Sequence, residues 1–113
     1  MDAATMNENE ILALAGLALH LASADGKLSA EEARELGELG LEVGGGDRFK
    51  VAITQAERRF QTAKDALDFA SEITNEDTRS FIHTVLSDLA NADELHEAEA
   101  DLLARIKLMW GIR

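Results

Sequence analysis

The sequence predicts an all-α protein, a single compact helical bundle of five to seven helices formed by one domain over residues 1–113. The 113 residues include no proline, which is the strongest helix breaker. Apolar residues make up 46% of the chain, and most of them are Ala and Leu, which favour helices over strands. A chain of this length forms one modest core, so we expect one domain and not two.

A first helix is expected from about Glu8 to Ala24. Its residues 11–22 are apolar except for Gly16 and His20. A helix that is apolar nearly all round needs neighbours on every side, so we place it at the centre of the bundle. His20 is then expected to be a core or rim residue with a hydrogen-bond partner. At twelve residues the apolar run is too short to span a bilayer, which takes about 20.

A second helix is predicted to start at Ser29. The pair Ser29 and Glu32 has the spacing of a capping box, and Gly26 is typical of the residue just past a helix end. Small residues recur along this helix and predict that another helix approaches it closely: Ala33, Gly37, Gly40 and Gly44. The glycine run at residues 44–46 is interpreted as a loop inside the domain.

Between Phe49 and Ile73 the apolar residues recur at alternating spacings of four and three, which is helical. The pattern fits one long helix or two helices broken near Gln61, and the sequence does not distinguish them. A small basic patch on this segment is interpreted as a solvated helix face: Arg58, Arg59 and Lys64.

A further helix is expected after Thr74, which we predict to be its N-cap, and it should end near Asn91. The last helix is expected to start near Glu97 and to end at Gly111, because glycine suits the residue just past a helix end. Trp110 near its end is expected to cover the core.

The two ends of the chain resemble each other. Residues 21–25 read Leu-Ala-Ser-Ala-Asp, and residues 89–93 read Leu-Ala-Asn-Ala-Asp. Each copy is a helix, an Ala-Asp corner, a Leu, an acidic first turn and a second helix. We therefore predict two pseudo-two-fold-related helical hairpins that pack against each other, with the segment 49–73 alongside.

The net charge of −11 is large for a chain of this length. It repels phosphate backbones, so we expect no nucleic-acid partner, and it attracts cations and basic partners. The chain has no cysteine, which excludes disulfides and thiolate metal sites and suits the cytoplasm. The acidic, polar start lacks the basic residues and apolar stretch of a secretory signal.

The two acidic corners carry the candidate site. Asp25 and Asp93 each follow a predicted helix C-terminus, where the helix dipole opposes negative charge. Such an acid needs a compensating group: a cation is one candidate, and an Asx-type turn is the other. Glu32 and Glu99 lie in predicted first turns, where acids are favoured without any metal. The first corner also matches the second half of an EF-hand loop, but the first half is absent.

Residues 24–32, Ala-Asp-Gly-Lys-Leu-Ser-Ala-Glu-Glu, resemble the first acidic signature of the tellurite-resistance TerB-like family. Residues 92–99, Ala-Asp-Glu-Leu-His-Glu-Ala-Glu, resemble the second, and the resemblance extends over residues 11–112. Domains of this family also occur at the start of membrane-anchored DnaJ-like co-chaperones. The resemblance implies an all-helical bundle, a stress-linked bacterial role and a divalent-cation site with four acidic ligands: Asp25, Glu32, Asp93 and Glu99. The second signature departs from the family pattern, because Gly26 has no counterpart beside Asp93.

The leading functional hypothesis is a non-catalytic binding module. We expect its acidic corners to bind a divalent cation weakly, or a protein partner, or both. Because the predicted ligands are oxygen atoms, Ca²⁺ or Mg²⁺ is favoured over Zn²⁺. The partner is expected to be membrane-associated, with this chain in the cytoplasm at the inner face of the membrane and not membrane-spanning.

Two other functions stay open: a metal-assisted hydrolase that uses the same carboxylates, and a purely structural acidic adaptor. No Ser, Thr or His has a catalytic arrangement in the sequence, so we expect no enzyme. The sequence is compatible with a homodimer and does not decide the oligomeric state.

Overall fold

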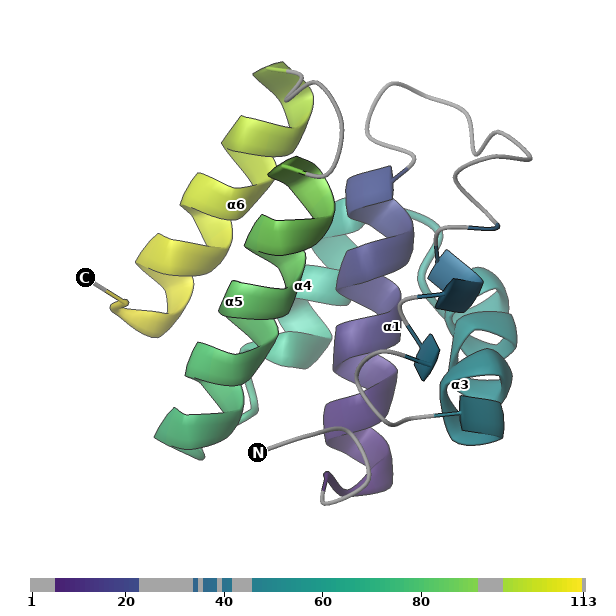
Figure 1. Cartoon of the computed structure of the whole chain (residues 1–113). Coiled ribbons are helices and arrows are strands. Elements are labelled where there is room, and N and C mark those ends of the chain that lie inside the picture. Colours follow the sequence, from purple (N-terminus) through teal and green to yellow (C-terminus); the bar gives the residue numbers. More distant parts are fainter. Residues whose placement is uncertain are drawn as a thin grey trace.

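The computed structural model describes residues 6–22, 34, 36–38, 40–41, 46–91 and 97–112. The regular elements of these segments are helices (Figure 1), and those with defined bounds are α1 (Glu8–Ala22), α3 (Gly46–Arg59), α4 (Ala63–Ala70), α5 (Glu76–Asn91) and α6 (Glu97–Trp110). Further helical residues lie between positions 34 and 41. The predicted all-α bundle is confirmed.

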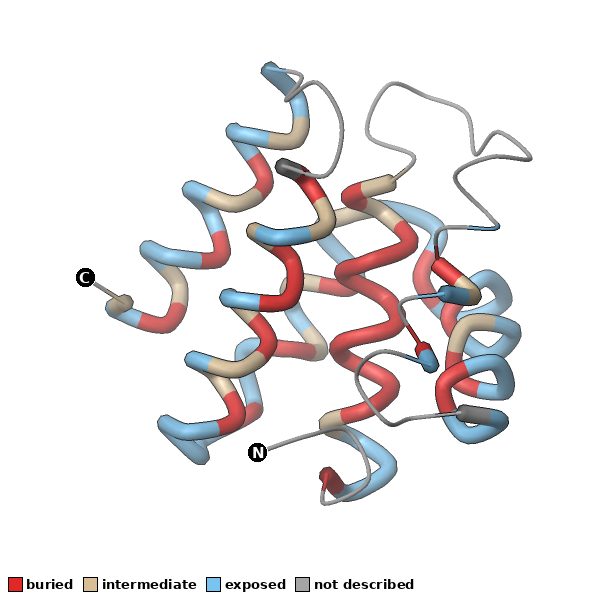
Figure 2. Tube along the Cα trace, viewed as in Figure 1, coloured by how far each residue is buried: buried red, intermediate tan, exposed pale blue. Residues whose placement is uncertain are grey.

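Helix α1 forms the centre of the bundle, as its apolar sequence predicts. It contacts α3, α4, α5 and α6. Residues 11–19 and Leu21 are buried, so the helix has no solvent face over most of its length (Figure 2). Its start is held by a reciprocal cap. The Asn7 side chain accepts the Glu10 backbone N–H at 2.9 Å, and the Glu10 carboxylate accepts the Asn7 N–H at 2.9 Å.

The two ends of the chain share one core. Leu21 is fully buried, and Leu89 packs half-buried against the same apolar cluster. The predicted contact between the first and last helical segments is therefore confirmed for α1 with α5 and α6. The first corner and most of the predicted second helix lie outside the described residues, so the pseudo-two-fold relation stays a prediction.

The segment from Phe49 to Ile73 forms two helices, α3 and α4, which resolves the alternative that the sequence left open. The break falls at residues 60–62. Thr62 caps α4 with a capping box, in which its hydroxyl accepts the Asp65 N–H at 3.2 Å and the Asp65 carboxylate accepts the Thr62 N–H at 3.3 Å. The break also turns the Phe60 side chain into the core.

The predicted cap of α5 is wrong by one residue. The helix begins at Glu76, and the Asn75 side chain, not Thr74, accepts the Thr78 backbone N–H, at 3.1 Å. Asn ranks above Thr as an N-cap residue, which is the physical reason for the shift. At the C-terminal end of α6, buried Trp110 covers the core as predicted, and its indole N–H donates to the Ala70 carbonyl oxygen at 3.1 Å.

The small residues on the predicted second helix have different surroundings. A Cβ atom at Gly40 would lie 2.8 Å from Cδ1 of Phe49, so Gly40 allows the close approach of α3 that the sequence predicts. At Gly37 no described atom lies within 4 Å of such a Cβ, so the described residues show a close approach at Gly40 and not at Gly37. Ala33 and Gly44 lie outside the described residues.

Candidate functional site

The structure describes one of the four predicted metal ligands. Glu99 lies in the first turn of α6 and is half-buried. Asp25, Glu32 and Asp93 lie outside the described residues. Glu99 shares its turn with Glu97, and acids in a first turn interact favourably with the helix dipole. The electrostatics of this turn therefore stabilise α6 without any ion.

The described helices that flank the two corners in sequence meet at one end of the bundle. The C-terminal ends of α1 and α5 and the N-terminal end of α6 lie at the same end (Figure 1). Residues 23–33 follow α1, and residues 92–96 connect α5 to α6. By chain connectivity, the segments that carry the predicted ligands therefore start from this one end.

No group of three or more His, Cys, Asp or Glu side chains could hold a metal ion within the described ranges. Glu99 is thus the one predicted ligand whose position can be stated. A complete coordination shell for a divalent cation takes six to eight oxygens for Ca²⁺ and six for Mg²⁺. Such a shell needs the corner residues, or water, in addition to Glu99.

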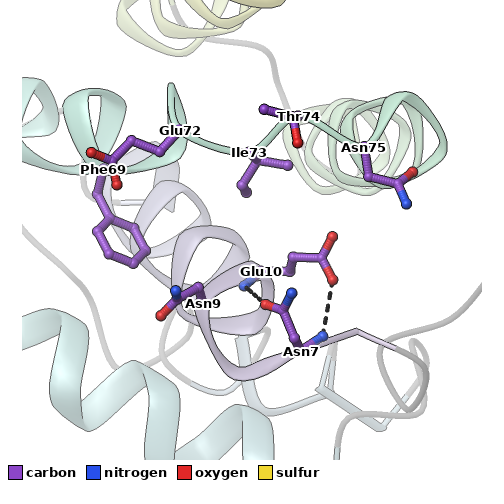
Figure 3. A pocket seen from close by; sticks show the side chains of 8 residues that line it. All are labelled: Asn7, Asn9, Glu10, Phe69, Glu72, Ile73, Thr74 and Asn75. Atoms are coloured by element: carbon purple, nitrogen blue, oxygen red, sulfur yellow. Dashed lines mark hydrogen bonds between the residues drawn. The ribbon is translucent and has the colours of Figure 1, made fainter.

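A polar cavity of about 360 Å³ opens at the opposite end of the bundle, beside the N-termini of α1 and α5 (Figure 3). The described residues that line it come from the start of α1 and from the region between α4 and α5: Asn7, Asn9, Glu10, Phe69, Glu72, Ile73, Thr74 and Asn75.

Helix caps account for much of this polar lining. The Asn7 and Glu10 side chains form the reciprocal cap of α1, and the Asn75 side chain caps α5. The cavity was not predicted from the sequence, because it forms where two helix N-termini that are distant in sequence meet. Helix capping explains the polar groups of Asn7, Glu10 and Asn75 in its lining without a ligand.

The two described histidines, His20 and His83, are both partly buried between helices. The Nε2 atom of half-buried His20 donates to the Phe60 carbonyl oxygen at 3.0 Å, which confirms the predicted core or rim role. Burial lowers the pKa of His83 below its usual value of 6.5, and the nearby positive charge of Lys107 lowers it further. His83 lies on α5 and Lys107 on α6, and these two helices are neighbours.

The three basic residues on α3 and α4 are exposed, which confirms the predicted solvated face, and Arg59 in addition stacks on aromatic rings. The Arg59 guanidinium lies over the Phe69 ring, 4.8 Å from its centroid, and 6.0 Å from that of Phe60. The two rings are themselves 5.3 Å apart. Lys64 forms an exposed ion pair with Asp68 at 2.9 Å. The stacking was missed because the helix break between Arg59 and Phe69 hides it from helical periodicity.

None of the helices in the described parts is long and apolar enough to cross a membrane. Comparison with curated proteins and with solved structures found no match. A family model does match: it is described as tellurite resistance protein TerB and covers residues 11–113. Because this match takes in nearly the whole chain, including both acidic signatures, the protein belongs to the TerB family.

Proposed function

We propose that this chain is a non-catalytic, stress-response module of the TerB type that binds a divalent cation at its two acidic corners. The proposed ligands are Asp25, Glu32, Asp93 and Glu99. One observation carries the proposal: α1 and α5 end, and α6 begins, at the same end of the bundle (Figure 1). That arrangement favours a single site, or two adjacent ones, over two sites at opposite ends.

The helix dipoles give a physical reason for a cation at this end. The C-terminal ends of α1 and α5 are negative poles, and in the sequence Asp25 and Asp93 follow them by a few residues. A divalent cation relieves this accumulation of negative charge. Two or three carboxylates with water completing the shell give a loose site for Ca²⁺ or Mg²⁺, with a dissociation constant on the order of 10⁻⁴–10⁻³ M.

The same acidic end would recruit a protein partner. A net charge of −11 attracts basic surfaces at long range, and a bound cation can bridge to an acidic group of a partner. We propose a membrane-associated partner, with this chain in the cytoplasm at the inner face of the membrane.

A thermal melt at fixed ionic strength tests the cation site. With Ca²⁺ or Mg²⁺ well above the dissociation constant, binding should stabilise the fold by about 1–3 kcal/mol relative to Na⁺. Asp25→Asn and Asp93→Asn should each reduce this effect. Glu57→Gln, which removes an exposed carboxylate from α3, is the matched control and should retain it. If divalent ions add nothing beyond matched Na⁺, the acidic corners act only as helix caps and a charged surface.

The hydrolase alternative needs its own experiment. A screen for phosphatase and esterase activity with Ca²⁺, Mg²⁺ or Mn²⁺ should give no turnover above a buffer control. Turnover that requires the metal and disappears in Asp25→Asn would make the same carboxylates catalytic and would overturn the non-catalytic assignment.

A further inference from the structure

We draw no further inference here: the strongest candidate, the polar cavity of about 360 Å³ between the start of α1 and the connection from α4 to α5, is bordered by two helix N-termini whose cap residues supply much of its lining, and no described polar side chain in it is both buried and without a partner, so nothing there points to a ligand.

Discussion

The indole N–H of Trp110 donates to the carbonyl oxygen of Ala70 at 3.1 Å, across a sequence separation of 40 residues. Ala70 is the last residue of α4, where backbone carbonyls have no partner within their own helix. The same oxygen also accepts the Ile73 backbone N–H at 3.1 Å, so the indole is its second donor, and this second bond fixes the end of α6 against α4. It also explains why a large side chain with a polar group stands at position 110.

Trp110→Phe tests this bond. The substitution keeps an aromatic ring but removes the indole donor, while the Ala70 carbonyl keeps its bond from the Ile73 N–H, so the free energy of unfolding should fall by about 0.5–1.5 kcal/mol. Because Trp110 is the single tryptophan, unfolding in urea has to be followed by circular dichroism rather than fluorescence. Val51→Ala, at an exposed position, should change the midpoint little. An unchanged midpoint in Trp110→Phe would show that the bond contributes nothing.

Gly16 of α1 packs against the Phe60 ring, at the break that separates α3 from α4. A Cβ atom at Gly16 would lie 2.6 Å from Cδ2 of Phe60, whose ring is buried. Gly16→Ala should therefore destabilise the fold by about 1–3 kcal/mol, although Ala is the better helix former.

Two comparisons make this prediction specific. Gly37→Ala, where the described surroundings leave open space, should be neutral or stabilise by up to about 1 kcal/mol. In the background of Phe60→Leu, adding Gly16→Ala should cost less than it does alone, since the smaller side chain relieves the clash. Equal costs in both backgrounds would show that the ring does not set the limit.

The sequence predicted most of the fold because its strongest signals are local. The apolar run from residue 11 to 22 can be buried on every side only at the centre of a small domain, so it predicted the central helix. The recurrence of apolar residues every three or four positions likewise predicted α5 and α6. Features that depend on contacts between distant segments were missed, such as the stacking of Arg59 on Phe69 and the bond from Trp110 to Ala70.

The candidate site was harder to predict from the sequence, because it too depends on how distant segments lie relative to one another. Acidic residues in a first turn, such as Glu99, are explained equally well by the helix dipole and by metal binding. Only the spatial relation between the corners separates these explanations. The cation site is proposed from the common end shared by α1, α5 and α6, and this relation depends on packing rather than on any motif.

The N-cap of α5 can be tested by comparing alanine substitutions at the adjacent residues Asn75 and Thr74. Asn75→Ala should destabilise the fold by about 1 kcal/mol, because the Thr78 N–H loses the side-chain acceptor at 3.1 Å. Thr74→Ala should cost less than about 0.5 kcal/mol, as expected for an exposed position away from such features. Chemical unfolding of both variants measures the difference. If Thr74→Ala lowers the free energy of unfolding more than Asn75→Ala does, Thr74 is the N-cap, as the sequence predicted.

His83, with the positive charge of Lys107 on the neighbouring helix, should make the stability of the fold depend on pH. Burial, and then the charge of Lys107, hold the folded pKa of His83 below its usual 6.5, so the unfolded chain binds more protons as the pH falls through that value. The stability that neutral His83 contributes is present above pH 6.5 and is lost below it. His83→Gln should flatten the dependence of the unfolding free energy between about pH 7.5 and 5.5, and Lys107→Gln should reduce it in part. Glu57→Gln, far from this pair in sequence and exposed on α3, should leave the slope unchanged. If stability instead rises toward pH 5.5 in the parent chain and not in His83→Gln, protonated His83 is stabilised in the fold, and the direction argued here is wrong.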